Sequence, residues 1–136
     1  MEEIEVRTKK HLQVVDITSE LEKKVEGVEQ GLLTLYVPHT TAAVTIQEGD
    51  KALWEDLLKT YRKLVPLEDD YEHNAQYSGM SGEQNAHAHI LSSLIKPFVS
   101  VPIERGKMAL GTWQRILFIE LDGGRNRKVK IQLLKE

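Results

Sequence analysis

Residues 112–134 read TWQRILFIELDGGRNRKVKIQLL, and this stretch decides the fold class. The run Ile116-Leu117-Phe118-Ile119 leaves neither face of an extended segment at 112–121 polar, which predicts a central strand buried on both sides. From residue 129 to 133 every second residue is apolar, as expected of a strand with one face in water. Turn-forming residues at 122–125 join the two segments. The carboxy-terminal third is therefore predicted to be antiparallel β structure.

The remaining segments predict further strands and three helices. Helices are expected after Ser19, which with Glu22 forms a candidate capping box, after Asp50, and after Asn85. Residues 66–83 are acidic and rich in turn residues, so we expect a long loop without regular structure, of a kind that often serves a function. Extended segments are expected at 4–6 and 12–17, as a first strand or hairpin, and at 32–37, 42–46, 98–103 and 108–110.

The composition limits the classes of function. A chain of 136 residues with 40% hydrophobic content is expected to form a single domain over residues 1–136. A net charge of -3 gives no general attraction to nucleic acid or to an anionic membrane, so neither is expected as a partner. No apolar run approaches the roughly 18 residues of a membrane span, and the acidic start is unlike a secretory signal, so we expect a cytoplasmic protein.

Four of the five histidines fall in three short strings, at 38–43, 71–74 and 85–90. Because the chain has no cysteine, imidazole and carboxylate are the only strong ligands available for a transition metal. A catalytic zinc site needs three ligands and one open position, so one histidine from each string, His39, His73 and His89, is a candidate ligand. Any one histidine alone is more often structural or exposed.

The two histidines of the third string face different ways on a helix. On a regular helix that begins at Asn85, His87 points along the middle of the apolar face and His89 points almost opposite. We therefore interpret His87 as a partly buried side chain bonded to a backbone group. His11, which precedes an extended segment, carries no functional signal.

Other polar residues leave alternatives open. Thr40 and Thr41 supply hydroxyls, but no Gly-x-Ser-x-Gly elbow is present, which disfavours nucleophilic acyl chemistry. Glu48 is either a general base or ligand, or a solvated turn residue. Arg125 and Arg127 either clamp a phosphate or are charges on a solvated hairpin. The glycine-containing strings match neither a P-loop nor a dinucleotide fingerprint.

Five strings in the chain resemble, in their order, those of the YjbQ-like family, also called the secondary thiamine-phosphate synthase family. They are His39-Thr40-Thr41-Ala42-Ala43, Tyr71-x-His73, Asn85-Ala86-x-Ala88-His89-Ile90, Gly111-Thr112-Trp113-Gln114 and Asp122-Gly123-x-Arg125-x-Arg127-Lys128-Val129. The likeness spans nearly the whole chain. It implies an α+β fold with an antiparallel β-sandwich-like core and two or three short helices. It also implies a homotrimer whose site lies close to a subunit boundary.

The resemblance implies an activity that joins a hydroxymethylpyrimidine diphosphate to a thiazole phosphate, giving thiamine phosphate and pyrophosphate. It places a divalent metal, zinc or magnesium, on His39, His73 and His89. The family strings and their neighbours supply the remaining candidates, with Glu48 and Thr41 as catalytic residues. Those expected to contact the phosphorylated substrate are Arg125, Arg127, Trp113 and Asn85.

Ligand chemistry leaves three further interpretations. Histidine suits zinc, whereas magnesium prefers oxygen, so a three-histidine site favours water activation over holding a magnesium pyrophosphate. The chain is then a metal-dependent hydrolase, or a metal or small-metabolite binding module whose synthase activity is incidental. Alternatively, the histidines hold subunits together. The chain also departs from the family, with Gly49 where Asn is frequent, Leu91 where Lys is frequent, and Gly124 where Pro is frequent.

Overall fold

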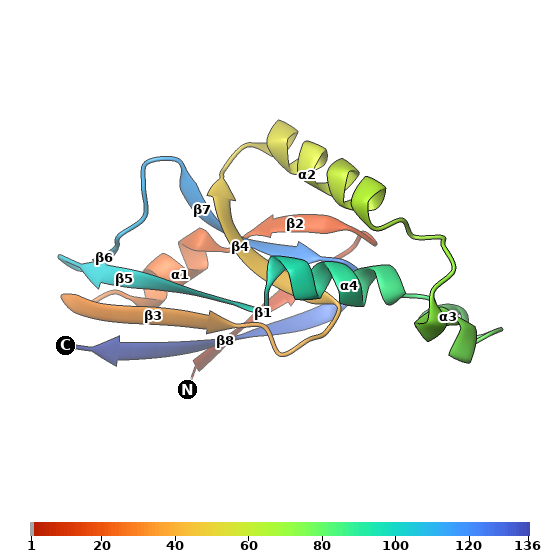
Figure 1. The fold of residues 1–136 in the computed structure, drawn as a ribbon. Helices are drawn as coiled ribbons and strands as arrows, with labels where there is room; N and C mark the ends of the chain where they lie inside the picture. The colour runs from red at the N-terminus through yellow and green to blue at the C-terminus, as the bar shows by residue number, and fades with distance from the viewer. Residues whose placement is uncertain (1) are drawn as a thin grey trace.

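The computed structural model describes residues 2–136, which form two antiparallel sheets and several short helices (Figure 1). Five strands pair in the order β1-β8-β3-β5-β6 and three in the order β2-β7-β4. The strands are β1 (Glu2–Arg7), β2 (Gln13–Asp16), β3 (Gln30–Tyr36), β4 (Ala42–Glu48), β5 (Phe98–Glu104), β6 (Lys107–Met108), β7 (Gln114–Glu120) and β8 (Asn126–Lys135). The helices are α1 (Thr18–Lys24), α2 (Lys51–Leu64), α3 (Glu72–Gln76) and α4 (Ala86–Ile95), with a 3-10 turn η1 (Ser81–Glu83).

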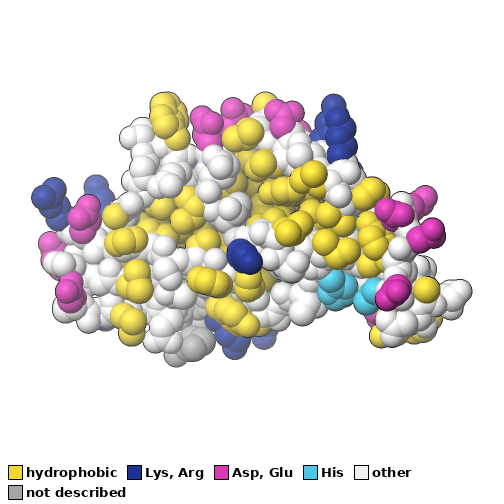
Figure 2. All heavy atoms as spheres, viewed as in Figure 1, with side chains coloured by type: hydrophobic (Ala, Val, Ile, Leu, Met, Phe, Trp, Pro, Cys, Tyr) yellow, Lys and Arg dark blue, Asp and Glu magenta, His cyan; other side chains and the backbone are white. Residues whose placement is uncertain are grey.

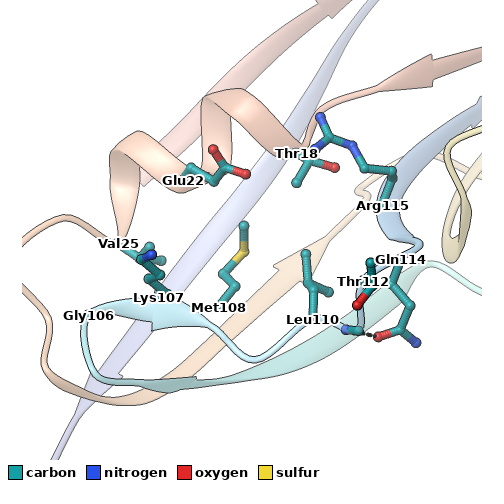
Figure 3. Close-up of a pocket in the computed structure, with 11 residues that line it drawn as sticks. Thr18, Glu22, Val25, Gly106, Lys107, Met108, Leu110, Thr112, Gln114 and Arg115 are labelled. Carbon is teal, nitrogen blue, oxygen red and sulfur yellow. Dashed lines mark hydrogen bonds between the residues drawn. The ribbon is translucent and has the colours of Figure 1, made fainter.

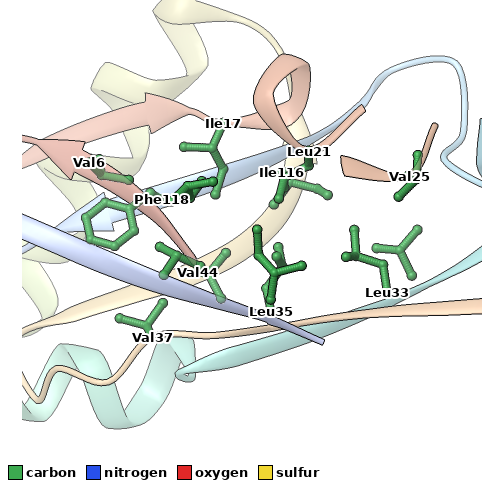
Figure 4. Packing of buried hydrophobic residues seen from close by; sticks show 14 of the residues in the cluster. Val6, Ile17, Leu21, Val25, Leu33, Leu35, Val37, Val44, Ile116 and Phe118 are labelled. Atoms are coloured by element: carbon green, nitrogen blue, oxygen red, sulfur yellow. The ribbon is translucent and has the colours of Figure 1, made fainter. Parts of the chain in front are cut away.

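The two sheets pack face to face, and α2 and α4 cover the outer face of the smaller sheet (Figure 1). Strand β7 lies at the centre of the smaller sheet and is buried on both faces, as its apolar run predicts. Ile116 and Phe118 pack between the sheets with Leu35 (Figure 4). Leu117 and Ile119 pack on the other side, against the helices. The α+β class and the antiparallel sheets expected from the sequence are confirmed.

The chain passes repeatedly from one sheet to the other. Strand β8 alternates buried and exposed residues as predicted, but it pairs with β1 and β3 in the larger sheet, whereas β7 pairs with β2 and β4. The turn at 121–125 therefore joins two strands that are not paired with each other. The same holds for β1 and β2, so the first two strands do not form a hairpin. The order of strands in a sheet depends on contacts between residues far apart in sequence. Local sequence patterns carry no information about those contacts.

The predicted helix termini are only partly confirmed. Asp50 caps α2, and its Oδ1 accepts hydrogen bonds from the backbone N–H groups of Ala52 and Leu53. The capping box at Ser19 is wrong, because α1 begins at Thr18, two residues earlier than predicted, and its N-cap Ile17 makes no side-chain bond. The segment 66–83 is also more regular than predicted, since it contains α3 and η1.

The start of helix α4 is capped by a residue of another helix, α3. Its N-cap Asn85 makes no capping bond, and Asn74 Oδ1, at the middle of α3, accepts the hydrogen bond from Ala86 N instead, at 3.0 Å. This contact joins the start of α4 to α3. Within residues 2–136, no helix is both long and apolar enough to cross a membrane.

Candidate functional site

The three histidines proposed as ligands lie around one end of the molecule. His39 is in the loop between β3 and β4, His73 is in α3, and His89 is on the exposed side of α4. The rings of His73 and His89 have centroids 4.9 Å apart, and His39 and His89 line a common open cavity of about 610 Å³ with Thr40. Figure 2 shows histidine side chains together where α4 meets α3. Three strings far apart in sequence therefore meet in one region.

His39 is held in one tautomer by the backbone. Its Nε2 accepts a hydrogen bond from Lys128 N at 3.0 Å, so the neutral ring carries its proton on Nδ1. Partial burial lowers the pKa of His39, and the positive charge of Arg127 lowers it further. His39 is therefore a neutral imidazole at pH 7, with one N–H left to donate.

The arrangement does not fit a three-histidine metal site within one chain. Among residues 2–136, no three His, Cys, Asp or Glu side chains are close enough to hold an ion. His39 Nε2 already accepts the Lys128 hydrogen bond, so its metal-binding lone pair is occupied. His73 Nδ1 lies 3.0 Å from Asn74 Oδ1, which fixes the proton on Nδ1 and leaves Nε2 unprotonated. Only the neighbouring rings of His73 and His89 remain as a pair of candidate ligands.

A buried ion pair lies behind His39. Glu120 at the end of β7 is wholly buried, and Arg127 on β8 binds it through both Nε and Nη2. Thr8 Oγ1 donates to the same carboxylate at 2.6 Å. Burial acts to raise the pKa of Glu120, but hydrogen bonds from Arg127 and Thr8 outweigh it and hold that pKa below its usual value. The ion pair is thus fully charged at neutral pH.

The ion pair engages two residues that were predicted to contact or act on the substrate, Arg127 and Thr41. Arg127 is buried, and its Nη2 also donates to Thr41 Oγ1 at 2.9 Å. Arg127 thus joins Glu120 to Thr41, and these bonds hold the loop that carries His39. Glu120 is not among the site residues predicted from the sequence, although a single glutamate within the apolar run 116–121 is the signal that could have identified it.

Asp122 organises a second polar cluster next to the start of α4. Asn85 Nδ2 donates to Asp122 Oδ2 at 2.9 Å, and Arg125 Nη2 donates to the same oxygen at 3.0 Å. Arg125 is half exposed, so its guanidinium remains accessible to a ligand. Asn85 is buried. These two candidate substrate contacts therefore differ in accessibility.

His11 and His87 meet beside Asp122. No sequence pattern predicted this contact. His87 is 1% exposed and its Nε2 lies 3.0 Å from His11 Nε2. The predicted burial of His87 is confirmed. Its Nε2 meets a second histidine, which was not predicted, while the backbone of Leu121 acts on the ring to raise its pKa although Nδ1 makes no hydrogen bond of good geometry in residues 2–136. Burial, followed by the neighbouring His11, lowers the pKa of His87.

Two other predicted site residues lie at the far end of the same strands. Glu48 pairs with Gln114, whereas Ala42 pairs with Glu120, so about 20 Å of strand separates Glu48 from the His39 end. Trp113 is 72% exposed beside that far end. A cavity of about 430 Å³ lies there between α1 and the residues 106–115, lined by Glu22, Met108 and Arg115 among others (Figure 3). One chain therefore does not bring Glu48 or Trp113 to the histidines.

Comparisons with known proteins agree with the fold. The chain matches the family model described as UPF0047 protein YjbQ-like over residues 2–136. A UPF0047 protein of Archaeoglobus fulgidus is 44% identical over 132 residues, which are 97% of this chain and 99% of that protein. The UPF0047 protein YugU of Bacillus subtilis is 34% identical over 134 residues, covering 96% of each.

Solved structures show the same fold. A hypothetical protein of Aeropyrum pernix K1 superposes with a TM-score of 0.92 at 39% identity, covering 99% of this chain and 98% of that one. A protein of the YjbQ/UPF0047 family from Clostridium acetobutylicum gives 0.90 at 39% identity, covering 98% and 100%. By sequence and by structure, this chain belongs to the YjbQ-like (UPF0047) family.

Proposed function

We propose that the cavity between His39 and His89 is the active site of an enzyme that acts on a phosphorylated small molecule. The observation that carries the proposal is the state of His39. Partial burial and the positive charge of Arg127 favour its neutral form, and the hydrogen bond from Lys128 N to Nε2 places the proton on Nδ1. A neutral imidazole with one fixed N–H can donate a hydrogen bond to a phosphate oxygen without adding a charge of its own. His89, across the cavity, supplies a second imidazole.

The reaction that family resemblance favours is thiamine-phosphate synthesis. A carbon–nitrogen bond forms between the two substrates while pyrophosphate leaves, and negative charge develops on the departing oxygens. His39 Nδ1–H and the half-exposed Arg125 are the donors we assign to that charge. Arg127 and Thr41 are positioning residues in this proposal, because Arg127 is engaged with Glu120 and with Thr41.

A divalent metal, zinc or magnesium, enters the proposal only through His73 and His89. Their neighbouring rings supply two nitrogens, and a further ligand has to come from a neighbouring chain or from the substrate's phosphates. We propose the homotrimer for the same reason. A neighbouring chain could bring Glu48 and Trp113 to the cavity that they do not reach within one chain. The cytoplasmic location expected from the sequence is part of this proposal.

The experiment measures pyrophosphate release from the two thiamine precursors by the wild type, His39→Ala, His89→Ala and a surface control, Lys63→Ala on α2. We expect the two histidine variants to lose about 100-fold or more of kcat and the control to keep its rate. Circular dichroism shows whether each variant is folded. Full synthase rates in both folded histidine variants would show that the activity does not belong to this cavity.

A binding module for a metal or small metabolite is the second candidate. The observation that favours it is that the two serine hydroxyls of the cavity are bonded to backbone groups. Ser92 Oγ donates to Ala42 O, and Ser93 Oγ donates to Ile90 O. Neither serine is paired with a histidine that could activate it as a nucleophile. Calorimetric binding of thiamine phosphate without any turnover, lost in His39→Ala, would support this candidate over the enzyme. A metal-dependent hydrolase would instead release inorganic phosphate only after zinc is added.

A further inference from the structure

His11 and His87 converge from distant parts of the chain, outside the cavity assigned above. His11 lies in the loop between β1 and β2, and His87 lies on the buried face of α4, 76 residues later. Their Nε2 atoms are 3.0 Å apart and their ring centroids are 5.1 Å apart. Two imidazole nitrogens at this separation share either one proton or one cation, because two bare lone pairs would repel each other.

Asp122 lies beside the more exposed ring of the pair. Its Oδ1 lies 3.8 Å from His11 Nδ1, and its other oxygen is held by Asn85 and Arg125. A carboxylate on that side favours a proton on His11 Nδ1, so that the lone pair of Nε2 points to His87. Metal-binding histidines are commonly oriented in this way by a carboxylate on the other nitrogen.

The same cluster holds polar atoms that the protein leaves unpaired. In residues 2–136, the buried side-chain polar atoms without a partner are Asn85 Oδ1 and His87 Nδ1, and both belong to this cluster. Buried polar groups in folded proteins are almost always hydrogen-bonded, so an exception needs a reason. A leucine at position 87 would pack on the apolar face of α4 without this cost. A ligand on Nε2 does not pair Nδ1, so what a histidine offers here that a leucine does not is the Nε2 atom facing His11, where a cation can bind.

We propose that His11 and His87 form a two-histidine site for a divalent transition metal, with zinc as the test ion. Zinc binds imidazole nitrogen at about 2.0–2.1 Å, which at a tetrahedral angle separates the two nitrogens by about 3.4 Å. His11 has to move by a few tenths of an ångström, and its loop position and 41% exposed side chain allow this. Because residues 2–136 offer no group of three ligands, water completes the coordination. Magnesium is a poor fit, since it prefers oxygen.

The test titrates Zn²⁺ alone into the chelator-treated full chain by isothermal calorimetry. The variants are His11→Gln, which changes an exposed side chain, and the double variant His73→Gln/His89→Gln. We expect His11→Gln to weaken one zinc equivalent by at least 10-fold and the double variant to retain that equivalent. Asp122→Asn should weaken it by about 10–100-fold, because it removes the negative charge beside His11 Nδ1.

Nitrogen NMR of the imidazoles gives a second readout that does not depend on activity. Zinc should shift Nε2 of both His11 and His87, whereas a shared proton alone leaves both signals unchanged on addition of zinc. Unaltered zinc affinity in His11→Gln, or an Nε2–H···Nε2 proton that persists in excess zinc, would overturn the proposal. Zinc that is lost only in the double variant would belong to the His39–His89 cavity, so the two proposals can fail separately.

Discussion

Glu120 is a single buried carboxylate whose lone pairs are all engaged. Arg127 and Thr8 bind it from the side, and the backbone N–H groups of Leu121 and Asp122 donate to Oε2 at 3.0 Å each. Such a group stabilises the fold only while every partner is in place, because an unpaired buried charge is expensive. The position of the His39 loop depends on this pair, since Arg127 also binds Thr41.

Glu120→Gln should lower the free energy of unfolding at pH 7 by about 3–5 kcal/mol, because it leaves the Arg127 guanidinium buried without a counter-charge. The pKa of Glu120 is depressed in the folded state, so its contribution is complete above the usual value of 4.5 and is lost as the pH falls further. Urea unfolding at several pH values measures the difference from wild type, which should shrink below pH 4.5. Glu55→Gln, at an exposed site on α2, is the control, and an equal loss in both variants would contradict the prediction.

His39 should titrate below the usual histidine pKa of 6.5, because burial and Arg127 both disfavour its cation. NMR titration of the imidazole carbon-bound protons checks this directly. If His39 acts in its neutral form, the acid limb of kcat/KM should also lie below 6.5. A measured pKa at or above that value would remove the physical basis for assigning His39 as a neutral donor.

At the scale of elements, β3 and β8 approach so closely at Gly31 that no side chain fits. A Cβ placed on Gly31 would overlap the carbonyl oxygen of Leu134, which belongs to the backbone of the neighbouring strand and cannot rotate away. The pairing continues through the register from Gly31 with Lys135 to Tyr36 with Lys130. This pairing holds β8 next to β3, and with it the Arg127 and Lys128 groups that contact the site.

Gly31→Ala should therefore destabilise the protein by about 1–3 kcal/mol, as overpacking in a tight position usually does. Gly82→Ala in η1 is a matched control, because a Cβ there meets no atom within 4 Å. Thermal unfolding of both variants measures the difference. A Gly31→Ala protein as stable as Gly82→Ala would mean that the strands separate at this point without cost.

At the scale of the whole molecule, the predicted active-site residues are divided between two ends. The histidines lie at one end of the β4–β7 pair, and Glu48 and Trp113 lie at the other. Figure 2 also shows hydrophobic side chains over β5 and α4. Phe98 in β5 and Leu94 in α4 are among the large hydrophobic side chains that are exposed. Exposed apolar surface of this kind is typical of regions that contact another protein chain. The proposed homotrimer has to place Glu48 and Trp113 of one copy beside the histidines of another for all of these residues to share one site.

Trp113 can report on that association. Trp54→Phe leaves Trp113 as the only indole, and in a trimer that buries it we expect a blue-shifted emission that moves to the red on dilution. Analytical ultracentrifugation of the same samples should show three chains per particle where the emission is blue. A sedimenting monomer, or emission typical of a fully exposed indole at every concentration, would contradict the proposed homotrimer.

Local patterns in the sequence determined several elements of this fold. The apolar run in β7 predicted burial on both faces, alternation predicted β8, and Asp50 predicted the start of α2, because each depends on residues within one turn or strand. The opposite orientations of His87 and His89 on α4 were predictable for the same reason. Resemblance to known strings supplied the family and the sandwich-like core.

Tertiary structure alone decided which of these groups meet. The contacts between Glu120 and Arg127, between His11 and His87, and between Asn74 and the start of α4 join segments that only the sheet order and helix packing bring together. The separation of Glu48 from the histidines likewise follows from the antiparallel path of β4. Periodicity fixes which side of an element is buried, but the partner across the interface depends on how distant segments share the burial of apolar surface.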